Sequence, residues 1–176
     1  IYIFVYYLFK TLIMGNDILA KGIELLPFTL AHPLHGFMEN VEKENWSGAM
    51  NYALDFFETS SQFLSIVLMG YLKTECKDIR NNRIVVKAIG KIDNQRPLSF
   101  GDWVNDILTP LAILSRSMMP DNSFVKSLSN VVSSKNNIIL GRKGEQSIVK
   151  IRNDYKGHGT TLSQDIYKDI TLKLEG

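Results

Sequence analysis

Residues 46–75, with the sequence WSGAMNYALDFFETSSQFLSIVLMGYLKTE, decide the fold of this chain. Apolar residues recur three, four or seven positions apart along it, at Trp46, Met50, Ala53, Phe57, Leu64, Val67 and Tyr71. This spacing draws one stripe along a helix, whose start Asn45 or Ser47 can cap. More apolar residues widen the stripe, at Leu54, Phe56, Phe63, Ile66 and Leu68. We therefore predict a long central helix that other elements cover on several sides.

Helical spacing also dominates the segments on either side of this stretch. Before it, we expect one or two helices in residues 1–25 and a shorter helix from Pro33 or Leu34 to about Glu44. After it, we expect a helix over 99–118, which Ser99 caps and Pro110 kinks or ends. A second helix begins at Asp121 or Ser123, and a third runs from about Glu145 through Tyr155. A last helix begins at a capping box at Thr161, and its inward residues are Leu162, Ile166, Ile170 and Leu174.

One segment has a different composition. Residues 83–89, RIVVKAI, are rich in β-branched side chains and stand between Asn81-Asn82 and Gly90. We predict an isolated strand or a small hairpin over residues 83–93. The expected fold class is therefore all-α, a bundle of about five or six helices with a small β insertion, in a single domain over 1–176. Residues 1–45 form an N-terminal helical extension of the core bundle, 46–176, in this prediction.

Length and composition are those of an ordinary globular domain, with 176 residues of which 45% are hydrophobic and 22% charged. The formal charge of +2 does not by itself indicate nucleic-acid binding, because such proteins concentrate basic residues on one face. Cys76 is the sole cysteine, which excludes an intrachain disulfide and favours a reducing, cytoplasmic setting. The chain starts without a methionine and stops soon after an amphipathic run, so we expect a fragment of a longer polypeptide.

The apolar N-terminus, Ile1–Phe9, suggests a signal peptide or a membrane span. Its apolar run reaches only Met14 and contains Lys10, whereas a span needs about 20 apolar residues. A basic leader and a small-residue cleavage site are also missing. We expect a core or interface helix instead, with no membrane partner, and the aromatic residues favour an oligomer contact.

The residues best suited to catalysis lie in the run Ile151–Gly159, IRNDYKGHG. Arg152 offers a fixed fork of donors to a phosphate, and His158 can exchange protons near neutral pH. Positions six apart lie on largely opposite faces of a straight helix, so the two side chains need a bend to meet. Gly157 and Gly159 flank the histidine with permissive backbone and can supply that bend.

Structural roles for these residues remain open. Arg152 can pair with Asp154 or Glu145 on the surface, and His158 can cap the preceding helix. A second candidate, His32 with His35, has a spacing seen in metal sites, but no cysteine or third histidine is nearby, so we expect no metal there.

The Arg152-Asn153 pair followed by His158 resembles the signature of the HEPN superfamily of helical domains. That signature is an arginine, usually followed by a polar residue such as asparagine, and then four to six residues to a histidine. The resemblance covers about residues 46–176, and only 152–159 is specific. It implies an α bundle that cleaves RNA without a metal or other cofactor.

In such ribonucleases the histidine acts on the ribose 2′-hydroxyl or the leaving oxygen, and the arginine steadies the charged phosphorane. The resemblance therefore implies that Arg152, His158 and Asn153 are catalytic and that Lys156, Tyr155 and Lys150 hold RNA. It also implies a homodimer with a composite site, in a toxin or phage-defence effector with an antitoxin or a fused second domain. The alternative is a non-catalytic HEPN-like dimerisation, sensor or regulatory module of a larger protein.

Overall fold

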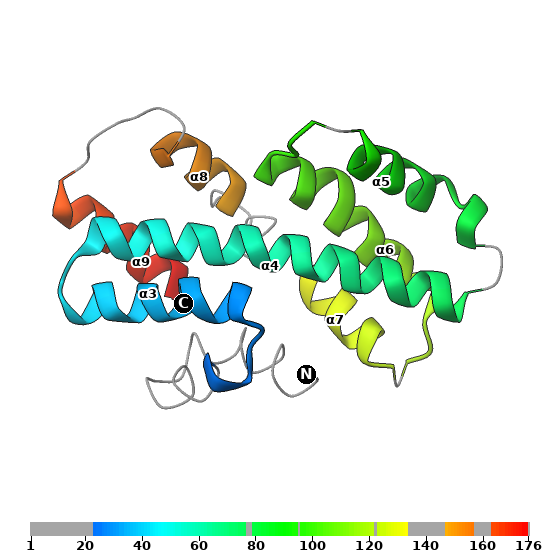
Figure 1. The fold of residues 1–176 in the computed structure, drawn as a ribbon, viewed down its shortest axis with the longest axis horizontal. Coiled ribbons are helices and arrows are strands. Elements are labelled where there is room, and N and C mark those ends of the chain that lie inside the picture. The colour runs from blue at the N-terminus through cyan, green and yellow to red at the C-terminus, as the bar shows by residue number, and fades with distance from the viewer. Residues whose placement is uncertain are drawn as a thin grey trace. The chain divides into compact units, whose positions relative to one another are not determined.

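The computed structural model describes residues 23–76, 79–94, 96–121, 123–133, 147–156 and 163–175. Every regular element in these ranges is helical (Figure 1), which confirms the all-α class. The elements are α3 (Phe28–Glu42), α4 (Trp46–Glu75), the 3₁₀ turn η1 (Ile79–Asn81), α5 (Arg83–Asp93), the π-helix η2 (Asp102–Leu108), α6 (Thr109–Met118), α7 (Phe124–Val132), α8 (Ile148–Lys156) and α9 (Gln164–Glu175).

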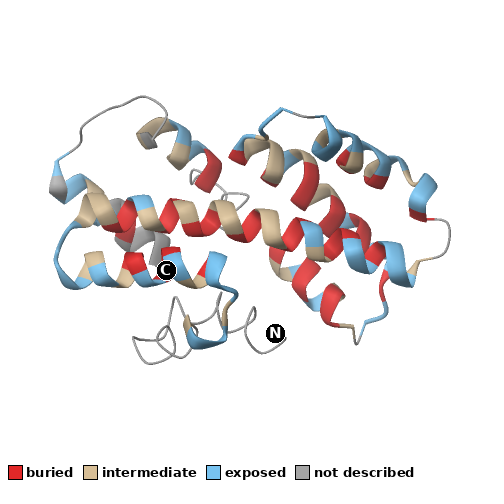
Figure 2. Ribbon diagram, viewed as in Figure 1, coloured by how far each residue is buried: buried red, intermediate tan, exposed pale blue. Residues whose placement is uncertain are grey.

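The chain divides into two compact units. The first contains residues 1–59 and 150–176, and the second contains residues 60–149. Helix α4 is the long helix that the sequence predicts, and it contributes residues to both units. In Figure 2 the ribbon of α4 is coloured as buried at intervals along its length. Its buried residues run from Ala49 to Leu72. The stripe has two exceptions, because Ile66 and Tyr71 are 60% and 40% exposed.

In the first unit, a tight turn joins α3 to α4. The N–H of Asn45 donates to the carbonyl of Asn40 at 2.8 Å, and the N–H of Glu44 donates to that of Val41 at 3.0 Å. This is a Schellman motif, with Glu44 in the left-handed region at φ 53°. Of the two predicted caps, Asn45 makes the bond, because its Oδ1 accepts from the N–H of Gly48 at 3.2 Å.

Helix α3 begins earlier than the sequence predicts. It starts at Phe28, directly after Pro27, and continues through Pro33. A proline inside a helix removes one hydrogen bond, here to the carbonyl of Thr29. Pro33 is buried, and burial of its apolar ring contributes favourably to the fold.

Gly36 allows close approach between α3 and α4. A Cβ at this position would lie 2.7 Å from Cζ of Tyr52, inside van der Waals contact. The ring of Tyr52 also meets that of His32 edge-on, with centroids 6.3 Å apart. From α9, the Nζ of Lys168 lies 5.1 Å from the ring centroid of Trp46, a cation–π contact with the start of α4. The predicted inward position of Ile166 on α9 is wrong, since this side chain is 45% exposed.

In the second unit, the predicted β insertion at 83–93 is wrong, because these residues form α5. The Oδ1 of Asn82 accepts from the N–H of Ile84 at 2.9 Å, so the polar residue interpreted as a strand boundary is a helix cap. Val85 and Ala88 are buried three positions apart, which is helical spacing. The apolar period therefore outweighs the β-branched composition.

The predicted helix over 99–118 is divided. The Ser99 hydroxyl accepts from the N–H of Asp102 at 3.2 Å and donates to its carboxylate at 2.7 Å, which confirms Ser99 as the cap. The chain then runs as the π-helix η2, in which the N–H of Thr109 reaches the carbonyl of Val104. Pro110 comes directly after Thr109 and has no N–H to donate. In a regular α-helix its ring would clash with the carbonyl of Asp106, four residues earlier, and the wider turn of the π-helix avoids that clash.

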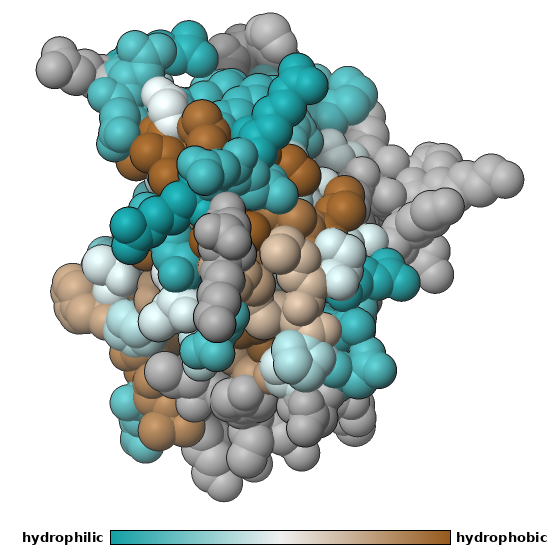
Figure 3. Space-filling model, turned by 90° about the vertical axis from the view of Figure 1, so that its right-hand side faces the viewer, coloured by the Kyte–Doolittle hydropathy of each residue, from teal (hydrophilic) through white to brown (hydrophobic). Residues whose placement is uncertain are grey.

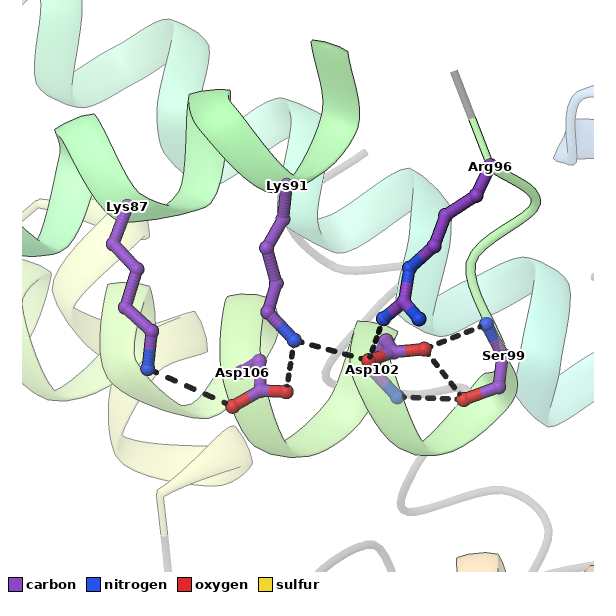
Figure 4. Close-up of polar contacts among 6 residues, drawn as sticks. All are labelled: Lys87, Lys91, Arg96, Ser99, Asp102 and Asp106. Carbon is purple, nitrogen blue, oxygen red and sulfur yellow. Dashed lines mark hydrogen bonds and ion pairs between the residues drawn. The ribbon is translucent and has the colours of Figure 1, made fainter. Parts of the chain in front are cut away.

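Helices α5 and α7 both pack against α6. Helix α7 starts where predicted, with the hydroxyl of Ser123 accepting from the N–H of Lys126 at 3.2 Å. A side-chain network also joins α5 to η2 (Figure 4). The Nζ of Lys91 lies 3.0 Å from the carboxylate of Asp102 and also bonds Asp106. Lys87 pairs with Asp106 at 3.8 Å.

Bonds from the Ser99 hydroxyl, then from Lys91 and the Ser99 N–H, hold the pKa of Asp102 well below its usual range. Its bonds to Asp106 and Asp102 raise the pKa of Lys91. The lowered carboxyl pKa stabilises the fold above the unfolded value of about 3.9, and this stabilisation is lost as pH falls below it.

We expect Gly36→Ala to lower the free energy of unfolding by about 1–3 kcal/mol, because the new methyl group meets the Tyr52 ring. Gly70→Ala is the matched control, since a Cβ there meets nothing within 4 Å. It should raise stability by about 0.5–1 kcal/mol by favouring the helix. Urea unfolding followed by circular dichroism measures both; equal effects would contradict the close approach.

We expect Asp102→Asn to lower the melting temperature at pH 7, because it removes the carboxylate that Ser99 and Lys91 bond. The difference from wild type should shrink as pH falls below about 4, where wild-type carboxylates begin to protonate in the unfolded chain. Asp93→Asn, at an exposed carboxylate at the end of α5, is the control. Thermal melts between pH 2 and pH 7 test this; a pH-independent difference would refute the electrostatic origin.

Candidate functional site

Helix α8 carries most of the motif found in the sequence. Its residues Lys150, Arg152, Asn153, Tyr155 and Lys156 are all helical, so the motif arginine has a fixed backbone. His158 lies outside the described residues. The expected approach of His158 to Arg152 therefore stays a prediction.

Arg152 lies against α4 in the first unit. Its Nη2 is 4.0 Å from Oε2 of Glu58, and the two side chains are 30% and 25% exposed. The Nε of Arg152 is buried and has no hydrogen-bond partner in the described part of the chain. The arginine thus has a carboxylate nearby without a close hydrogen bond to it. The observed partner is therefore Glu58, while Asp154, one of the two partners predicted for a structural role, pairs with Lys150. The other predicted partner, Glu145, lies outside the described residues, so that pairing stays a prediction.

The other motif residues diverge around α8. Lys150 pairs with Asp154 at 2.8 Å, one helical turn away. Asn153 is exposed, and Tyr155 is half-buried. Consecutive helical residues are about 100° apart, so Asn153 faces a different direction from Arg152. The side chain of Lys156 lies outside the described residues. Within this range, the structure brings Arg152 to Glu58 and leaves Asn153 in solvent.

Sequence reasoning missed Glu58. Its signal was present, since Asp55 and Glu58 are the charged residues in the stretch from Trp46 to Leu72. A half-buried carboxylate on such an apolar helix needs a cation or donors nearby. The motif arginine supplies that cation from a segment far along the chain.

The second candidate from the sequence was a metal site at His32 and His35. His32 stacks on Phe28, with ring centroids 5.7 Å apart. No group of three or more metal-ligating side chains exists among the residues that the structure describes.

Exposed apolar residues in the second unit include Ile66, Val86 and Ile113. On the face drawn in Figure 3, hydrophobic patches are interspersed with hydrophilic side chains.

Searches against protein-family models, curated proteins and solved structures found no match to this chain. Within the described ranges, no helix combines the length and apolar character needed to cross a bilayer.

Proposed function

We propose that this chain is a HEPN-type endoribonuclease domain that cleaves RNA without a metal or other cofactor, using Arg152 and His158. The observation that carries the proposal is the state of Arg152. Its guanidinium is partly exposed, its Nε has no hydrogen-bond partner among the described residues, and its carboxylate neighbour is 4.0 Å away. An arginine in this state keeps donors for a phosphate oxygen.

The reaction proposed is attack of a ribose 2′-oxygen on the adjacent phosphorus, with cleavage of the bond to the 5′-oxygen. An imidazole takes the proton of the 2′-hydroxyl, and a second imidazole protonates the leaving oxygen. His158 from each of two copies supplies these groups in a composite homodimer site. Arg152 stabilises the charge that develops on the non-bridging oxygens.

The supporting residues have smaller roles in this proposal. Asn153 is exposed on α8, follows Arg152 in the sequence, and orients the scissile phosphate or the histidine in this proposal. Lys150, Tyr155 and Lys156 hold the RNA, with the cations placed to neutralise phosphates. In the cell, the domain acts in the cytoplasm as a toxin or phage-defence effector, restrained by an antitoxin or joined to a second domain.

One observation favours the alternative, a non-catalytic dimerisation, sensor or regulatory module. The ion pair between Arg152 and Glu58 places a carboxylate of the same unit 4.0 Å from the motif arginine. If that pair were the arginine's whole role, the module would bind no phosphate there. The two functions differ in whether RNA is cut.

We expect the wild-type protein to cleave single-stranded RNA in the presence of a chelator, and His158→Ala to lose about 100-fold or more in rate. Arg152→Ala should lose a comparable factor, because the developing charge loses its donor. Gel analysis of a labelled oligonucleotide after incubation with each protein measures the rates.

His35→Ala is the matched control, since His35 is an exposed histidine on α3 and should leave the rate unchanged. Equal cleavage by wild type and His158→Ala would identify a contaminating nuclease. Absence of cleavage by every variant would favour the non-catalytic module.

A further inference from the structure

We infer that Glu58 is the positioning residue for Arg152. Its carboxylate orients the guanidinium toward a phosphodiester, which weakens RNA binding and raises the turnover number. The inference rests on the function proposed above. It assigns a role to a side chain on α4 that lies outside the motif.

The sequence of α4 makes Glu58 an unusual choice for its place. Between Trp46 and Leu72 the helix carries charge at Asp55 and Glu58, while neighbours such as Phe57 are buried. The Glu58 side chain is 25% exposed, so much of its hydration is lost on folding. A carboxylate in this setting attracts a cation, and Arg152 is the cation observed.

The distance between the two groups determines what the pair can do. At 4.0 Å, the contact from Nη2 to Oε2 is longer than a hydrogen bond of about 2.7–3.2 Å. The attraction therefore fixes the direction of the guanidinium without engaging its donors. A close bidentate pair would instead bind the same donors that a phosphate needs. The observed spacing suits an arginine that must bind a second anion.

The same carboxylate has an electrostatic effect on that anion. A negative charge beside Arg152 repels an incoming phosphodiester, so Glu58 lowers affinity for RNA. It raises turnover if the oriented guanidinium matches the phosphorane better than the bound substrate. Loss of the charge should therefore move binding and turnover in opposite directions, whereas loss of a merely structural contact would weaken both.

The test is Glu58→Gln, which keeps the size of the side chain and removes its charge. We expect Kd for a single-stranded RNA oligonucleotide to tighten by about fivefold and kcat to fall by about fivefold, the scale of one partly screened ion pair. Fluorescence anisotropy gives Kd, and steady-state cleavage at saturating RNA gives kcat. Glu58→Asp should recover part of kcat, because it restores the charge at a longer distance.

Glu75→Gln, an exposed acid at the end of the same helix, is the charge-matched control and should change neither quantity. If wild type cleaves RNA but Glu58→Gln matches it, or loses binding and turnover together with melting temperature, the inference fails while the proposed function stands. If wild type neither binds nor cleaves RNA, both fail. If wild type binds without cleaving, tighter binding by Glu58→Gln that Arg152→Ala abolishes would support the role of Glu58 in RNA binding and refute its role in turnover.

Discussion

Burial of one long apolar helix is the constraint on which the rest of the structure depends. Helix α4 supplies buried side chains to both units, from Ala49 and Met50 near its start to Leu72 near its end. Each fully buried Leu, Phe or Met side chain contributes about 1.5–3 kcal/mol, so leaving this helix in water is unfavourable. A helix this apolar must be covered by others, and the Gly36 contact in the first unit shows how closely one of them approaches.

The features that could be predicted from sequence are those set by local physics. The period of α4 and the capping side chains of Asn45, Ser99 and Ser123 act over a few residues, so each is visible in a short window. The segment 83–93 was misjudged because composition and period disagreed there. The helical spacing of Val85 and Ala88, both of which are buried, outweighs the β-branched composition.

Other features depend on packing partners that a sequence does not name. The exposure of Ile66 and Tyr71 on α4 is not visible in the local pattern, since both residues continue an otherwise buried stripe. The candidate site likewise contains one residue that local sequence identifies and one that only the fold identifies. The motif predicted Arg152 as a residue of interest from its local spacing, whereas Glu58 lies in a distant segment and becomes its neighbour only through the fold.

Stability alone does not explain Arg152. A partly exposed ion pair contributes about 0–1 kcal/mol, and the pair with Glu58 is at the long end of such contacts. The buried Nε without an acceptor among the described residues costs about 1–3 kcal/mol. A methionine would cover similar apolar surface without that cost. The fold thus gains little from a guanidinium here, which is consistent with the proposed role of Arg152 in binding an anion.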